Sequence, residues 1–220
     1  MPTKNIHLPS TEKTIIYLMV IYLIGIVGML VEATRSIFIF LVPLNIIGAV
    51  TIILLYHKDW SKRFLLIVSA ICLGGFLIEW MGIRTGIIFG NYQYGTGLGP
   101  KIAQVPIVMG LNWFLLVYGA TVISSKLLNK RFLIAAMGAS LMVVYDLFLE
   151  PSAMQYSFWN WDGDMVPLRN YLTWWISAFV FIYFYLVTIK IQPKNPVAEA
   201  IFWLQLAFFV CLYLGNKFII

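Results

Sequence analysis

Seven long apolar blocks, separated by short polar segments, form the main pattern of the chain. Each block is long enough to cross a hydrocarbon core of about 30 Å as a helix. None alternates between apolar and polar positions, as the strands of a transmembrane barrel do. The pattern therefore predicts seven membrane-spanning helices. Their approximate ranges are 14–31, 37–57, 64–83, 105–128, 132–150, 170–189 and 198–216.

The composition supports a membrane protein. Of the 220 residues, 61% are hydrophobic and 11% are charged, whereas about a quarter of the residues of a soluble domain are charged. We therefore expect an all-α fold, a polytopic integral membrane helical bundle with about seven transmembrane helices. Residues 1–220 are expected to form a single transmembrane helical domain, with the lipid bilayer as its partner.

The net charge of +6 comes from basic residues at the ends of the spans, not from a cluster on a soluble face. This distribution signals topology and argues against nucleic-acid binding. One side holds Lys4, Lys13, Lys58, Lys62, Arg63, Lys126, Lys130, Arg131, Lys190 and Lys194, and the other holds Arg35, Arg84, Lys101, Arg169 and Lys217. The positive-inside rule then predicts a cytoplasmic N-terminus. We expect the inner (cytoplasmic) membrane of a bacterium.

Three acidic residues, Glu79, Asp146 and Glu150, lie within or at the ends of predicted spans. Charged groups are costly in a bilayer, so they mark candidate functional sites there. In the predicted orientation all three lie at the outer end of the bundle. The two long connections, 84–104 and 151–169, lie at that end too. The polar chemistry of the chain is therefore expected to gather there.

Asp146 and Glu150 are four residues apart on one predicted helix and share a face. Two carboxyls this close in a medium of low dielectric do not both ionise readily. An acid that keeps its proton beside a base that has lost one suits general acid–base catalysis. The alternative is a structural set of salt bridges with Arg84 or Arg169, and both interpretations can hold together.

Aromatic and amide residues lie near these acids in the sequence. Tyr92, Tyr94, Trp159 and Trp161 form either an interfacial belt or a surface that stabilises a carbocation, worth about 2 kcal/mol when desolvated. The asparagines of two further spans either hold helices together or orient a water. The two histidines lie at the N-terminus and in a loop, so no metal site is expected. The residues of those two spans are Asn112 with Trp113 and Asn170 with Trp174.

Two polar stretches together resemble the CruF-type carotenoid hydratases, a family of membrane proteins. The resemblance covers the middle of the chain, from the third span to the start of the sixth, and it lies in the combination of motifs more than in any one of them. The matching residues are Glu79, Gly82, Thr85, Gly86, Phe89, Gly90, Tyr92, Tyr94, Gly99, Pro100, Pro106, Trp113, Asp146, Glu150, Pro151, Trp159, Trp161, Pro167, Asn170 and Trp174.

The resemblance implies a hydratase that adds water across the terminal C=C bond of an acyclic carotenoid (psi) end group and forms a tertiary alcohol. The substrate is then a lycopene-like or gamma-carotene-like polyene dissolved in the membrane. The chemistry of the residues agrees, because a protonated carboxyl in an apolar site can protonate the alkene and a base can direct water at the cation. This reaction requires no cofactor and no metal.

The resemblance and the residue types suggest roles, as hypotheses. Asp146 or Glu79 donates the proton, and Glu150 or Asp164 orients the water or accepts its proton. Arg84 is expected to tune one carboxylate. The end-group pocket is expected to contain Tyr92, Tyr94, Asn112, Trp113, Trp159, Trp161, Asn170 and Trp174.

Two other functions remain open at this point. A carotenoid end-group cyclase begins with a similar protonation, but a double bond of the substrate itself captures the cation. A proton-coupled transporter uses buried acids as relays. Transporters commonly show internal repeats and broken helices at the midplane, and the chain shows no convincing repeat.

Overall fold

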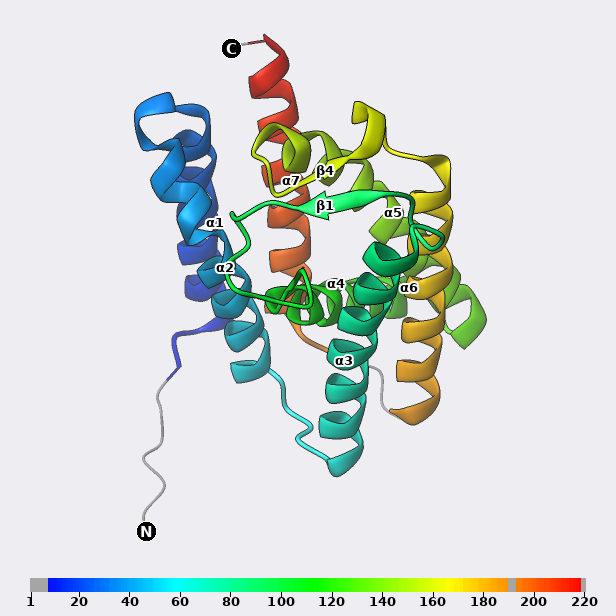
Figure 1. Ribbon diagram of the computed structural model, residues 1–220. Coiled ribbons are helices and arrows are strands. Elements are labelled where there is room, and N and C mark those ends of the chain that lie inside the picture. The colour runs from blue at the N-terminus through cyan, green and yellow to red at the C-terminus, as the bar shows by residue number, and fades with distance from the viewer. Residues whose placement is uncertain (1–7, 190–192, 219–220) are drawn as a thin grey trace.

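The computed structural model describes residues 8–189 and 193–218. Within them lie seven helices that are long and apolar enough to cross a membrane (Figure 1), which confirms the predicted helical bundle. The helices are α1 (Thr11–Leu30), α2 (Glu32–Leu55), α3 (Lys62–Thr85), α4 (Val108–Leu127), α5 (Arg131–Gln155), α6 (Leu168–Thr188) and α7 (Pro196–Phe218). Lys4 and Lys190, used above to predict orientation, lie outside the described residues.

Helix α4 is the central helix of the bundle. Nearly all of its residues are buried, whereas fewer than half are buried in the spanning part of every other helix. It contacts α2, α3, α5, α6 and α7 (Figure 1). Because α4 is enclosed by the others, nearly all of its side chains face the interior of the bundle.

Small residues let α3 and α4 approach closely. A Cβ atom added to Gly75 would lie 2.5 Å from Cβ of Trp113, and one added to Gly110 would lie 2.4 Å from the backbone oxygen of Cys72. Glycine permits such contacts because it has no side chain, and membrane helices often pack through small residues. The space at Gly75 is what admits Trp113 to the centre of the bundle.

Four short strands, which the sequence pattern did not predict, lie in the segments between α3 and α4 and between α5 and α6. They are β1 (Tyr92–Tyr94), β2 (Lys101–Ile102), β3 (Val105–Pro106) and β4 (Trp159–Trp161). Strands β1 and β4 pair antiparallel and lie across one end of the bundle (Figure 1). Tyr92 pairs with Trp161 and Tyr94 with Trp159, and all four side chains are buried while the middle residue of each strand is exposed. We call these four side chains the aromatic lid.

Most helix boundaries differ from the prediction by a few residues, and two of the differences move candidate residues. Helix α5 continues past Pro151, so Glu150 lies inside the helix instead of at its end. Pro151 gives up one backbone hydrogen bond without ending the helix. Helix α4 begins at Val108 because the preceding Val105–Pro106 pairs with β2. Asn112 therefore lies about one turn inside α4, not two.

We predict that Gly75→Ala destabilises the protein. The added methyl group would press on Trp113, and overpacking of this kind costs about 1–3 kcal/mol. Gly48→Ala in α2 is the matched control, because a Cβ there meets nothing within 4 Å and alanine favours a helix. Thermal unfolding of the purified protein in detergent measures both variants. Equal melting temperatures would contradict tight packing of Gly75 on Trp113.

Candidate active site

Three carboxyl groups are buried at the end of the bundle that the aromatic lid covers. Glu79 of α3 is 3% exposed, and Asp146 and Glu150 of α5 are 0% and 2% exposed. A buried carboxyl is costly unless hydrogen bonds replace its water. The donors around each carboxyl therefore indicate which of them can carry a charge.

Glu79 accepts three hydrogen bonds. The hydroxyl groups of Tyr92 and Tyr94 donate to Oε2 at 2.5 and 2.9 Å, and Nε1 of Trp113 donates to Oε1 at 3.0 Å. Burial and the neighbouring Glu79 raise the pKa of Tyr92 and Tyr94 well above the usual range, so both hydroxyls keep their protons. Three donors and no acceptor around one carboxyl suit its ionised form.

Glu150 also accepts three hydrogen bonds. Nε1 of Trp159 and Nε1 of Trp161 donate to Oε2 at 2.9 and 2.7 Å. Nδ2 of Asn170, in the first turn of α6, donates to Oε1 at 3.3 Å. The tyrosine strand of the lid thus binds Glu79, and the tryptophan strand binds Glu150. The lid holds carboxyls from two different helices in one site.

Asp146 has fewer donors than the other two carboxyls. Nδ2 of Asn170 donates to its Oδ2 at 2.8 Å, and within the described residues its Oδ1 has no hydrogen-bond partner. The same amide nitrogen therefore bridges Asp146 and Glu150. An ionised carboxylate with an unpaired oxygen is costly in a dry site, so Asp146 is the carboxyl best suited to hold a proton.

A small cavity lies against two of the carboxyls. Its volume of about 20 Å³ matches the space that one water requires, and both Glu79 and Glu150 line it, whereas Asp146 does not. A water there would contact both the carboxyl bound by the tyrosines of the lid and the carboxyl bound by its tryptophans. The other lining residues are Phe89, Tyr92, Tyr94, Met109, Trp159, Trp161, Asn170 and Trp174.

A larger, mainly apolar cavity of about 150 Å³ lies beside the small one, between α1, α2, α4, α5 and α7. Met109 and Trp159 line both cavities and form the boundary between them. Ile21 and Leu41, which also line the larger cavity, are 50% and 40% exposed on the outer surface of α1 and α2. The larger cavity therefore extends to the apolar outer surface of the bundle.

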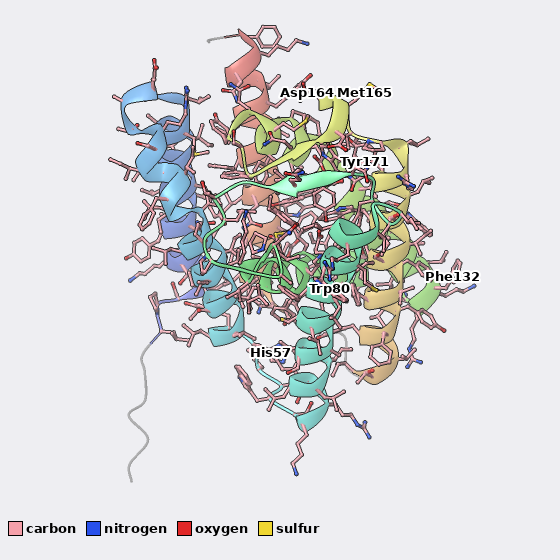
Figure 2. The ribbon with its side chains drawn as sticks, in the orientation of Figure 1. His57, Trp80, Phe132, Asp164, Met165 and Tyr171 are labelled. Atoms are coloured by element: carbon pink, nitrogen blue, oxygen red, sulfur yellow. The ribbon has the colours of Figure 1, made fainter. Side chains whose placement is uncertain are left out.

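The structure separates the remaining predicted residues. Trp113 and Trp174 stack at 4.7 Å beneath the carboxyls, and Asn170 binds two of the carboxyls, but Asn112 lines only the larger cavity. Asp164 is exposed, and Figure 2 shows it at the rim of the molecule, on the segment that follows β4. The structure therefore does not bring Asp164 to the carboxyls.

Within the residues that it describes, the structure does not show the alternative considered for the carboxyls, a set of salt bridges with Arg84 or Arg169. Arg84 and Arg169 are both exposed, and Nη2 of Arg169 donates instead to the backbone oxygen of Gly86 at 3.0 Å. In the described part of the chain the one ion pair joins Lys126 and Glu199. An exposed guanidinium keeps its water, so neutral donors of the lid and of α4 and α6 bind the carboxyls instead.

Three residues that the sequence analysis did not single out, Tyr22, Tyr145 and Gln205, line the larger cavity. A signal for Gln205 existed, because it is an isolated amide in the middle of an apolar span. Across residues 8–189 and 193–218, no three His, Cys, Asp or Glu side chains are grouped so as to hold a metal ion.

Comparisons with known proteins place the chain in a family. A family described as "carotenoid biosynthesis protein" matches residues 38–219. The chain is also similar to the bisanhydrobacterioruberin hydratase of Haloarcula japonica, with 32% identity over 130 residues. That match covers 54% of this chain and 44% of the relative, so the chain spans less than half of the relative's length. No solved structure matches the chain.

We predict that Tyr94→Phe lowers stability by about 1–3 kcal/mol, because it removes one of the hydroxyl donors from the buried Glu79 carboxyl. Tyr17→Phe is the matched control, since Tyr17 is 57% exposed on α1. Thermal unfolding in detergent measures the difference. The same melting temperature for both variants would show that the Tyr94 hydroxyl does not support Glu79.

Proposed function

Because the chain belongs to the carotenoid biosynthesis protein family, we propose that it is a carotenoid hydratase. The reaction adds water across the terminal C=C bond of an acyclic carotenoid end group and forms a tertiary alcohol. One observation carries the proposal: a cavity of the size of one water lies against two buried carboxyls and adjoins an apolar cavity that lipid-soluble molecules can enter. The similarity to a hydratase supports it.

The first step needs an acid. The alkene is protonated at its less substituted carbon, which leaves the cation on the tertiary carbon. In our proposal Asp146 and Glu150 share one proton at rest, since Asn170 bridges them and Asp146 has the fewest donors. Asp146 lines neither cavity, so the proton reaches the alkene from Glu150, which lines the small one. General acid catalysis of this kind contributes about 10²–10⁴-fold.

The second step needs stabilisation of the cation. Trp159 lines both cavities, and an alkene that passes from the larger cavity toward Glu150 lies against its ring. The electron-rich faces of Trp159, Trp161 and Tyr92 can attract the positive charge, an effect worth about 2 kcal/mol in a desolvated site. The indole N–H groups of both tryptophans are occupied by Glu150, which fixes the orientation of the rings.

The third step is capture by water. Glu79, ionised within its three donors, accepts a proton from the water in the small cavity as the C–O bond forms. The less substituted carbon has then gained a hydrogen atom, and the tertiary carbon has gained a hydroxyl group. The proton that Glu79 gains balances the proton that the Asp146–Glu150 pair loses. Transfer of a proton from Glu79 back to this pair restores the resting state of the site. The addition of water changes no overall oxidation state, so it requires no redox cofactor.

The proposed substrate rests on the same chemistry, and the proposed compartment rests on the charges of the connections. An apolar cavity that opens toward lipid suits a polyene dissolved in the bilayer, such as one with a lycopene-like or gamma-carotene-like end. We place the enzyme in the inner membrane of a bacterium, with its N-terminus in the cytoplasm, on the distribution of basic residues.

We predict that the protein, co-expressed with lycopene synthesis, produces a pigment heavier by one water. Glu79→Gln, Glu150→Gln and Asp146→Asn should each lower its yield at least about 100-fold, because each removes a proton carrier. Glu12→Gln and Asp59→Asn, at exposed or partly exposed positions away from both cavities, are the matched controls. Chromatography with mass spectrometry measures the pigment, and immunoblotting of membranes measures the protein.

Two outcomes would contradict the proposal. Full yield in any of the three carboxyl variants would remove that residue from the mechanism. An isomer of unchanged mass but altered absorption would show that a double bond of the substrate captures the cation, which is the cyclase reaction.

A further inference from the structure

The larger cavity is too small to hold a whole carotenoid. Its volume is about 150 Å³, and an apolar protein cavity of that size accommodates a molecule such as benzene. A carotenoid polyene is several times as large as benzene, so only its end group fits inside. The remainder of the polyene must leave the cavity through an opening, and the position of that opening decides where the remainder lies.

The opening lies between α1 and α2, which stand together at one side of the bundle (Figure 1). Among the described residues that line the cavity, Ile21 of α1 and Leu41 of α2 are the two that are exposed. The cavity is closed toward the centre of the bundle, because every lining residue on α4 and α5 is buried. These residues are Met109, Asn112, Tyr145 and Leu149.

Both sides of the opening lie at the depth of the lipid tails. Ile21 and Leu41 are equally far along the chain from Val31, which joins α1 to α2 and is followed by the exposed Glu32. A helix rises about 1.5 Å per residue, so each of them lies about 15 Å from this polar turn. That distance is about half of a hydrocarbon core that is about 30 Å thick. The opening therefore faces hydrocarbon and not water.

Helices α1 and α2 are held together on both sides of this depth. Near the turn, the ring of Phe38 occupies the space that a side chain on Gly28 would fill, and Oγ1 of Thr34 donates to the backbone oxygen of Gly28 at 2.9 Å. Near the other end of the two helices, the hydroxyl groups of Thr14 and Tyr56 form a hydrogen bond at 2.5 Å. The opening is therefore confined to the middle of the helix pair.

A glycine and a proline shape the two sides of the opening. Gly25 lies one turn from Ile21 and also lines the cavity, and it leaves space because it has no side chain. Pro43 lies inside α2, just after Leu41. A proline inside a helix removes one backbone hydrogen bond and kinks the helix. A small residue on one helix and an interrupted helix on the other therefore favour separation of α1 and α2 at this depth.

We propose that the polyene enters end-first between α1 and α2, and that its unreacted remainder stays in the bilayer, in the groove between Ile21 and Leu41, during the reaction. This inference rests on the proposed function and adds the path of the substrate to it. The apolar side chains at the opening match a hydrocarbon chain. Only the end group then leaves lipid for the cavity, so the enzyme never has to extract a whole polyene from the membrane.

Photocrosslinking tests where the polyene lies. A diazirine-bearing amino acid replaces Ile21 or Leu41, and the purified protein is irradiated in lipid nanodiscs that contain lycopene. Leu23 and Leu44 are the matched control positions on the same helices. They do not line the cavity, and they are 62% and 56% exposed, against 50% and 40% for Ile21 and Leu41. Mass spectrometry measures the lycopene adducts at each position.

We expect adducts at positions 21 and 41 to exceed those at positions 23 and 44 at least about 10-fold, which corresponds to a preference of about 1.4 kcal/mol for the opening. A polyene that is only dissolved in the lipid would label the more exposed control positions at least as strongly. Adducts that follow the exposure of the four positions would therefore overturn the inference.

Narrowing the opening tests whether the polyene passes through it. Ile21→Trp and Leu41→Trp place a larger side chain at its edge, and each should lower the rate of water addition at low lycopene concentration at least about 5-fold, because entry then limits the rate. The rate at saturating lycopene should fall less. Leu23→Trp and Leu44→Trp should keep the wild-type rate. Equal rates in all four variants, or an equal loss in all four, would contradict entry between α1 and α2.

The two measurements separate this inference from the proposed function, because crosslinking does not require the reaction. Selective adducts at positions 21 and 41 without any addition of water would leave the path standing and refute the hydratase proposal. Addition of water together with adducts that follow exposure would leave the hydratase proposal standing and refute the path.

Discussion

The need to satisfy three carboxyl groups in a region of low dielectric determines the architecture of this end of the protein. Bulk water does not reach the buried carboxyls, so most of their donors must come from the protein. Strand β1 supplies tyrosine hydroxyls to Glu79, strand β4 supplies indole N–H groups to Glu150, and Asn170 bridges Glu150 and Asp146. The pairing of β1 with β4, the depth of Trp113 and the start of α6 all follow from this requirement.

The unequal distribution of donors is what makes the carboxyls chemically different. Glu79 and Glu150 each have three donors, whereas Asp146 has one and keeps an oxygen without a partner in the described residues. Identical environments would give three equivalent acids. Unequal ones allow a proton to be stored at one carboxyl while another acts as a base, which is the condition for acid–base chemistry at a single site.

In the proposed reaction, the two cavities divide substrate binding from chemistry. The larger, mainly apolar cavity extends to the exposed surface of α1 and α2, and the small one has room for about one water. Met109 and Trp159 stand between them. In the proposed reaction, restricting water to one side of the reacting bond would direct the cation toward a single nucleophile.

The length and continuity of the apolar blocks determined the seven helices, because a chain in lipid must satisfy its backbone internally and a helix does so locally. The cost of buried charge likewise identified Glu79, Asp146 and Glu150. Only the tertiary structure decided their partners. The pairing of Tyr92 with Trp161 joins segments that are distant in the sequence. That Arg84 and Asp164 lie away from the carboxyls became visible only in the fold, where both are exposed. The enclosure of α4 was equally hidden, because its hydropathy of 1.5 equals that of α6. Burial depends on neighbouring helices, which local sequence does not specify.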